Sequence, residues 1–405
     1  MIYTSILILI LLYFDIIGYR YSKNIVNPVF SFNFIWTICF VLLIAGFSKY
    51  YSNEISRKAF FVFLAMILSF NLSYFSRICI KRNKSIICLN LIKAKSKYKF
   101  ICYLFYIWII CILLETIYCG NFPLIWLILG ENGNYASFGI PSIHGFINSL
   151  SWFVLNISFI YFLDEHDKRV LNIIVIINIF YIFLLARQSF TTEAIQLTCI
   201  FALKRNVKLK KIFAIALFGI FLFGIIGNIR TNYKHILSTS GLMYNDFPYL
   251  LMGFIWVYLY LMTPIANAAH FFDLYKEFQY GTSSLRGFLP SILTGSLNLP
   301  TIDFNDFLIS KTYNVSTSLI QPYSDFGIIG ICLFFAFLGR LGARYWKSLQ
   351  KDNYSDIDIC NYSIYCGILA LTFFSNMLLS LPIVIQFLYT NLLFRNHFSV
   401  KNIFD

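Results

Sequence analysis

Three arginines stand apart from the other basic residues because they fall in segments that carry few other charges. Arg187 lies in LLARQSF, Arg230 in GNIRTNY and Arg286 in GTSSLRGFLP. A guanidinium group donates paired hydrogen bonds and keeps its charge when partly desolvated, which suits arginine to phosphate. We therefore predict that the three arginines bind a pyrophosphate group and that Lys234 adds a point charge. The alternative is that each arginine anchors a helix at a membrane interface.

Asp325 is the most prominent carboxylate near these arginines in the sequence. It lies in NVSTSLIQPYSDFGIIG, residues 314–330, directly before an apolar run. Gly327 and Gly330 would let backbone or substrate approach closely. A carboxylate at the mouth of a helix can accept the proton of a hydroxyl group or orient that group. Capping of the helix by Asp325 is an equally good interpretation.

Other ionisable residues are weaker candidates. They are His144 and His235 as bases, and Asp15, Glu115 and Glu193 as acidic groups in or near apolar runs. Ionisable groups inside a membrane are costly, which makes these acidic residues conspicuous. For the histidines a plain surface position is the alternative, and for Glu193 we expect structural pairing with Arg187 or another arginine.

The sequence predicts no metal site and no cofactor. The ten cysteines fall mostly in apolar runs without the CxxC or Cys/His spacing of a metal or redox site. Acidic groups that could imitate metal ligands are the loop at 164–167, the pair Asp356 and Asp358, and the pair Asp303 and Asp306. We interpret the first as a solvated turn, while the two pairs lack a nucleotide-binding domain or further ligands.

These residues must be positioned by a membrane domain. With 59% hydrophobic and 12% charged residues among 405, the chain is far too apolar for a water-soluble protein. Its net charge of +14 comes from short basic clusters between apolar runs, which indicates cytoplasmic loops and not a nucleic-acid-binding surface. Apolar runs recur at 2–18, 29–47, 59–76, 100–118, 146–163, 170–186, 188–203, 212–228, 323–341, 360–379 and 381–394. We predict one all-α polytopic domain, residues 1–405, with about 11–12 transmembrane helices.

The basic residues predict the orientation. Segments 77–99 and 204–211 are rich in Lys and Arg and should be cytoplasmic. A smaller outer loop then covers 119–145, and a large outer region covers 229–322. Within it, 250–269 is expected to be a re-entrant or interfacial helix, because a full crossing would move the basic residues at 340–351 to the outer side.

Residues 314–339, NVSTSLIQPYSDFGIIGICLFFAFLG, resemble the hallmark of Wzy-type O-antigen and oligosaccharide repeat-unit polymerases. That hallmark is an Asn or Thr, an acidic residue in a DFG-like run, and a glycine followed by an apolar span that ends in glycine. The turn at Arg187, the GNIRTN motif and the long outer region also match the family. The resemblance covers residues 170–345. Related ligases place a His before the acidic residue, where this chain has Ser316 and Thr317.

The resemblance implies a metal-independent glycosyltransferase of the GT-C class in the bacterial inner membrane. It would transfer an undecaprenyl-pyrophosphate-linked glycan onto the next lipid-linked repeat unit at the periplasmic face, with a chain-length regulator as a further protein partner. The resemblance assigns pyrophosphate and leaving-group contacts to the three arginines, the acceptor side to Asp325, and further substrate contacts to Lys234, His235, Asn314 and Thr317. For the acceptor base, His235 and Glu193 stay open beside Asp325.

Two other functions remain as alternatives. An O-antigen ligase would transfer the same glycan to a lipid A core. A flippase or secondary transporter also has about a dozen spans, but such transporters show repeated halves with matching broken helices. In this sequence the irregular region occurs once, which favours the polymerase.

Overall fold

The computed structural model describes the chain except for residues 50–53, 79–93, 131–136, 206–213, 215–216, 222–223, 226, 229–232, 243–246, 301, 311–313, 352–353 and 395–405. The described residues are helical and contain no β-strand, and one isolated bridge joins Ser48 and Leu242. The all-α prediction is confirmed.

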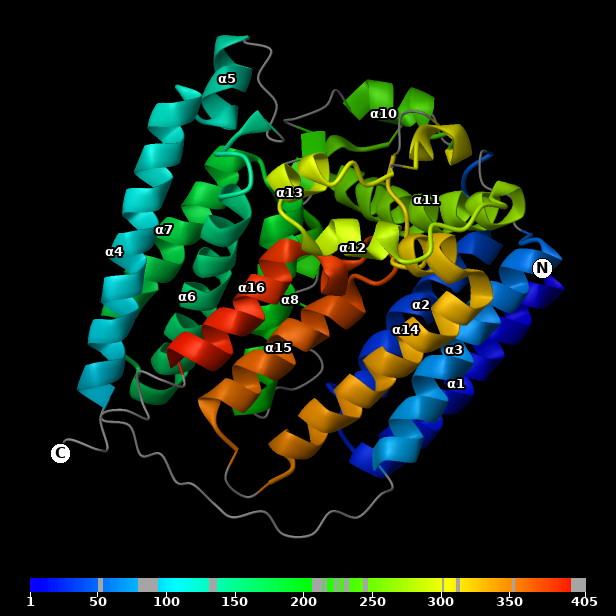
Figure 1. The fold of residues 1–405 in the computed structure, drawn as a ribbon, viewed down its shortest axis with the longest axis horizontal. Helices are drawn as coiled ribbons and strands as arrows, with labels where there is room; N and C mark the ends of the chain where they lie inside the picture. The colour runs from blue at the N-terminus through cyan, green and yellow to red at the C-terminus, as the bar shows by residue number, and fades with distance from the viewer. Residues whose placement is uncertain are drawn as a thin grey trace.

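Long helices run side by side and form a bundle (Figure 1). They are α1 (Ile2–Ser22), α2 (Pro28–Ala45), α3 (Arg57–Ile78), α4 (Ala94–Cys119), α6 (His144–Glu165), α7 (Arg169–Leu184), α8 (Arg187–Lys204), α14 (Ile320–Leu349) and α15 (Asp356–Ala370), and the short α16 (Leu381–Leu388) lies among them. Shorter elements are α5 (Pro123–Leu129), α10 (Tyr233–Thr239), η2 (Tyr249–Leu251), α12 (Thr282–Phe288), α13 (Ser291–Ser296), η3 (Phe304–Phe307), η4 (Met377–Leu379) and η5 (Tyr389–Phe394). A further long helix, α11 (Met252–Leu274), has a different direction.

The chain is a polytopic helical membrane protein. Within the described ranges, seven helices are long and apolar enough to cross a bilayer: α1, α2, α3, Ser96–Leu129, α6, Tyr249–Leu274 and α14. Two shorter apolar helices cover Arg169–Leu184 and Leu381–Leu393. Several predicted runs do not qualify, because α8 carries many polar side chains, α15 has 15 residues, and the run at 212–228 is described only in part. The total of about 11–12 crossings stays a prediction.

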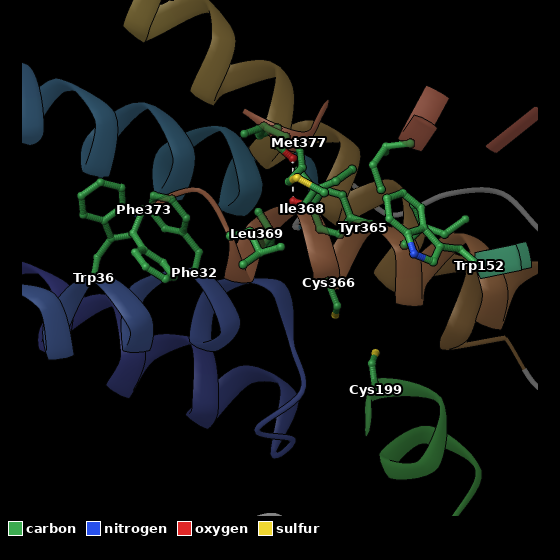
Figure 2. Close-up of a cluster of buried hydrophobic side chains, with 14 of the residues drawn as sticks. Phe32, Trp36, Trp152, Cys199, Tyr365, Cys366, Ile368, Leu369, Phe373 and Met377 are labelled. Atoms are coloured by element: carbon green, nitrogen blue, oxygen red, sulfur yellow. Dashed lines mark hydrogen bonds between the residues drawn. The ribbon is translucent and has the colours of Figure 1, made fainter. Parts of the chain in front are cut away.

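Two groups of helices meet at α15. Helices α1, α2, α3 and α14 pack together, and α4, α6, α7, α8 and α16 form the second group. Figure 2 shows how the interior continues between them: Phe32 and Trp36 of α2 lie beside Phe373, and Cys199 of α8 faces Cys366 of α15. Both cysteines are buried and free, so they act as small packing residues.

Basic side chains gather at one end of the bundle. Helices α1, α3, α8 and α14 each carry a basic residue in the last turn, namely Arg20, Arg77, Lys204 and Lys347. A cation in this position interacts favourably with the carbonyl end of the helix dipole. We call this the basic end of the bundle.

Four charged residues form an ion-pair network at the basic end. Lys97 Nζ lies 2.6 Å from Asp356 Oδ2, and Lys204 Nζ lies 3.0 Å from Asp356 Oδ1 and 2.9 Å from Asp164 Oδ1. The network ties α4, α6, α8 and α15 together. It also explains why Asp164 and Asp356 occur here, since both carboxylates pair with lysines.

Helix α11 lies across the opposite end of the bundle (Figure 1). It contacts the start of α8 through Trp256 and Arg187, the end of α2 through Tyr258 and Phe47, and the start of α3 through a 2.6 Å hydrogen bond from Ser56 Oγ to Asp273 Oδ1. A single helix that reaches all three places must cross the bundle end. The prediction that 250–269 is re-entrant or interfacial concerns its depth in a bilayer and stays a prediction.

Replacement of Asp356 by Asn should destabilise the bundle. Burial raises the pKa of Asp356, but Lys97 and Lys204 lower it further, so that the pKa lies below its ordinary value. Loss of one partner of a partly buried ion pair costs about 2 kcal/mol after allowance for its exposure. Because the folded-state pKa is depressed, this stabilisation is present above about pH 4 and is lost as the pH falls through the folded-state value.

The measurement is the thermal unfolding midpoint of the detergent-solubilised protein at neutral pH and at about pH 2, below the ordinary pKa of an aspartate. Asp356→Asn should lower the midpoint at neutral pH, and the difference from wild type should shrink in acid. Glu165→Gln at the same end is the control, because Glu165 is exposed and should tolerate the change. Equal midpoints for wild type and Asp356→Asn at neutral pH would contradict the network.

Candidate functional site

The polypeptide leaves helical geometry between α15 and α16, at the end of the bundle opposite the basic end. The sequence predicted one apolar run to residue 379, but α15 ends at Ala370. We call residues 371–382, which include η4 and the first two residues of α16, the junction segment. Its backbone and side chains bind distant parts of the chain: Trp36 Nε1 donates to Thr372 Oγ1 (3.0 Å), and the Ser318 amide donates to the Thr372 carbonyl oxygen (2.9 Å). Asn376 caps η4 by accepting from the Leu379 amide.

Arg187 begins α8 beside the junction segment. Its guanidinium carbon lies 4.9 Å from the ring centroid of Trp256 and 5.6 Å from that of Tyr260, both on α11. The next residue, Gln188, donates from Nε2 to Met377 Sδ at 3.3 Å. Arg187 is buried, so the aromatic rings hold its positive charge in a largely desolvated place.

The helix that carries Arg286 approaches the junction segment from another direction. Arg286 lies on α12, is exposed, and donates from Nη1 to the Leu299 carbonyl oxygen at 3.1 Å. A Cβ atom on the neighbouring Gly287 would stand 2.5 Å from the Leu379 carbonyl oxygen, so only glycine allows α12 to pack this closely. Arg187 and Arg286, 99 positions apart in sequence, therefore both adjoin residues that contact 377–379.

Asp325 lies next to a break in α14. Phe326 and Gly327 have non-helical backbone angles, and Gly327 has φ 59° and ψ −141°, a combination that favours glycine. At Gly330 a Cβ atom would stand 2.0 Å from the Pro322 carbonyl oxygen. The prediction that Gly327 and Gly330 permit close approach is confirmed, and what approaches them is the protein itself.

The break frees two carbonyl groups that a continuous helix would satisfy, and the residues just before α12 bind them. The Gln279 amide donates to the Ser324 carbonyl (2.8 Å) and the Tyr280 amide to the Asp325 carbonyl (3.2 Å). The Asp325 carboxylate in turn accepts the amides of Ser283 (3.0 Å) and Ser284 (2.9 Å), which are unsatisfied donors at the first turn of α12. Asp325 is therefore a buried cap for the helix that carries Arg286.

The other predicted contact residues are spread over the same end of the molecule. Thr317 is buried, and its hydroxyl accepts the Leu319 amide (3.3 Å), whereas Asn314 is exposed. Lys234 and His235 are exposed on α10, whose end is attached to the loop after α2 by the bond from Ser48 Oγ to the Ser240 carbonyl. Arg230 lies outside the described residues.

The expectation that Glu193 pairs with an arginine is wrong, because its partner is Asn178, and the pairing of Glu115 with His144 is not evident from the sequence. His144 Nδ1 lies 2.9 Å from Glu115 Oε2, and Asn178 Nδ2 donates to Glu193 Oε1 at 3.4 Å. Glu115 and His144 are 29 positions apart, and no short sequence pattern indicates that they are in contact. The pair is evident only from the packing of α4 against α6.

An apolar crevice of about 370 Å³ opens beside the start of α11. Its lining is almost entirely hydrocarbon and comes from Ala214, Leu217, Phe218, Ile220, Phe221, Leu250, Leu251, Gly253 and Phe254. Gly253 and Gly224 allow the backbone at residue 224 to approach α11 closely, since a Cβ on Gly224 would stand 2.5 Å from the Gly253 Cα. The crevice lies one helical turn from Trp256, the ring on which Arg187 stacks.

No known protein family, curated protein or solved structure matches this chain. The arrangement itself combines a desolvated arginine, an exposed arginine, a polar bundle end and an adjoining apolar crevice. Such a combination is suited to an amphipathic ligand that has an anionic head and a hydrocarbon tail.

Replacement of Asp325 by Asn should loosen α12. An amide offers one acceptor oxygen where the carboxylate offers two, and a hydrogen bond to a charged group contributes about 1.5–3 kcal/mol. We expect amide hydrogen exchange in residues 281–288 to accelerate by about 10-fold or more, as measured by mass spectrometry.

Asp303→Asn is the matched control for this experiment. Asp303 also caps a short helix by accepting a backbone amide, that of Asn305 in η3, and is exposed. Its replacement should leave exchange in α12 unchanged. Wild-type exchange of α12 in Asp325→Asn would contradict the capping role.

Proposed function

We propose that this protein is a repeat-unit polymerase of the bacterial inner membrane. It transfers an undecaprenyl-pyrophosphate-linked glycan onto the next lipid-linked repeat unit at the periplasmic face, without a metal ion or cofactor, in a GT-C-like helical frame. The observation that carries the proposal is the convergence of the Arg187 and Arg286 segments on the junction segment, opposite the basic end of the bundle. By the positive-inside rule that end faces outward.

In this reaction the acceptor hydroxyl attacks the anomeric carbon, and the bond to the pyrophosphate oxygen breaks. Negative charge develops on the leaving pyrophosphate, and arginine donors stabilise it most where water is excluded. Arg187, held on two aromatic rings, supplies a fixed charge, and exposed Arg286 reaches the ligand from α12. Asp325 contributes by holding α12 in place.

Arg230, Lys234, His235, Asn314 and Thr317 keep their proposed roles as further substrate contacts. The apolar crevice beside α11 supports a lipid-linked donor, because it offers hydrocarbon surface one helical turn from the ring that carries Arg187. A chain-length regulator is the proposed protein partner.

The test is the surface polysaccharide of a strain that lacks this gene. A polymerase defect leaves a single repeat unit on the lipid core, whereas long chains retained on undecaprenyl would indicate a ligase. Absence of lipid-linked units from the outer face would indicate a flippase. An unchanged polysaccharide ladder would overturn all three functions.

Arg286→Ala, expressed at the wild-type level in that strain, should reduce chain elongation by about 10-fold or more, because a charge-assisted hydrogen bond contributes about 1.5–3 kcal/mol. Arg286→Lys keeps the charge but loses the paired donors, so we expect an intermediate effect. Arg169→Ala is the control, since Arg169 is an exposed residue at the basic end that pairs with Asp167. Full elongation by Arg286→Ala would remove Arg286 from the site.

A further inference from the structure

A glutamate, a histidine and an asparagine form a hydrogen-bonded chain at the end of the bundle that holds the junction segment. His144, the first residue of α6, places Nδ1 2.9 Å from Glu115 Oε2 and 3.1 Å from Oε1. Asn148 Nδ2 lies 2.8 Å from His144 Nε2. Because a carboxylate only accepts hydrogen bonds, Nδ1 carries the proton and the Nε2 lone pair accepts the hydrogen bond from Asn148 Nδ2.

The local backbone is built around this imidazole. Gly139 has φ 102°, and a Cβ atom there would stand 2.4 Å from His144 Nδ1. The Ile140 amide donates to Glu115 Oε1 at 3.1 Å, which fixes the carboxylate as well as the ring. The side chain of Glu115 is 0% exposed and that of His144 is 27% exposed, so a reactant can reach the histidine and not the glutamate.

Contacts with α13 and the junction segment bring the histidine toward the arginines. Ser142 Oγ lies 2.9 Å from Ser291 Oγ, five residues beyond Arg286. Ser149 Oγ donates to the Pro382 carbonyl at 2.7 Å, and Gly145 faces the Pro382 ring. The start of α6 and the helix α12 therefore rest on the same short stretch, 379–382.

We propose that His144 is the general base for the acceptor hydroxyl and that Glu115 positions it, an inference that rests on the proposed function. The acceptor hydroxyl displaces the Asn148 amide from Nε2, and Nε2 takes the hydroxyl proton as the sugar oxygen forms its bond to the anomeric carbon. The bond between that carbon and the pyrophosphate oxygen breaks, and the pyrophosphate leaves with the electron pair. The proton on Nε2 then passes to solvent.

The neighbouring groups suit both protonation states of the imidazole. Glu115 stabilises the imidazolium, in the way that a buried carboxylate supports the histidine of a catalytic triad. Asn148 donates to neutral Nε2, while its Oδ1 is buried without a hydrogen-bond partner. A rotation of the amide lets that oxygen accept from the protonated Nε2. Next to the Glu115–His144–Asn148 hydrogen bonds, the Cys119 sulfur accepts a hydrogen bond from the Gly139 amide (3.1 Å).

The substrate for the test is the lipid-linked repeat unit extracted from the strain that lacks this gene. Full-length protein in detergent is incubated with it between about pH 5 and pH 8, and elongation is followed by mass spectrometry. His144→Gln should lower kcat/KM by about 100-fold or more. The wild-type decline in acid, which reflects protonation of the base, should be absent from this variant.

Glu115→Gln is the second variant, because an amide of the same size fills the site but favours the wrong tautomer. It should also lose about 100-fold in rate. His166→Asn is the matched control: His166 caps the other end of α6 and should leave both the rate and its pH dependence unchanged. Monodispersity and thermal midpoints verify that each variant is folded.

The outcomes separate the two proposals. Failure of wild-type protein to elongate the extracted substrate would overturn the polymerase function. If wild type and His166→Asn are active, a His144→Gln variant with the wild-type rate, or with a reduced rate that keeps the acid decline, would overturn the base assignment alone. A reduced rate without the acid decline supports it.

Discussion

The requirement that buried backbone groups find hydrogen-bond partners governs the end of this bundle that carries the candidate site. A helix satisfies its own amides and carbonyls, whereas the junction segment pairs only some of its backbone groups locally, and in a membrane protein the others must be bound by protein or line a cavity. Two of its carbonyls are bound from far along the chain, that of Thr372 by the Ser318 amide and that of Pro382 by the Ser149 hydroxyl, and the Trp36 indole binds the Thr372 hydroxyl. These bonds fix the segment against which Gln188 and Gly287 pack.

The break in α14 follows the same rule. Carbonyls freed at Ser324 and Asp325 are bound by amides of residues 279 and 280. The Asp325 carboxylate accepts two backbone amides at the start of α12. Each side therefore supplies what the other lacks, and α12 is held in one orientation. Since α12 also packs on the junction segment through Gly287, the two broken helices define the place of Arg286 together.

Sequence patterns predicted the features that depend on local composition. The apolar runs, the basic helix ends and the need for glycine at 327 and 330 are all visible in short windows. The end of α15 was not predictable, because a buried apolar loop and a buried apolar helix have the same composition. Pairings between distant residues were missed for a different reason: Glu115 meets His144, and Asp356 meets Lys97, only through helix packing. Asp325 shows this limit of sequence patterns most clearly. The sequence indicated that Asp325 could cap the helix that follows it, but the helix it caps is α12, whose Ser284 lies 41 positions earlier.

Polar residues deeper in the bundle have a complementary task. Asn33 and Asn71 exchange two hydrogen bonds between α2 and α3, while Gln196 bonds Asn156 and Gln386 across α6, α8 and α16. Interhelical bonds of this kind contribute about 0.6 kcal/mol each on average, so their main effect is to select one packing register among apolar surfaces that would otherwise slide. A fixed register matters because the site is built from helix starts: a shift of α8 by one turn would carry Arg187 away from Trp256 by about 5 Å. The amide clamps inside the bundle therefore determine the position of the charges at its end.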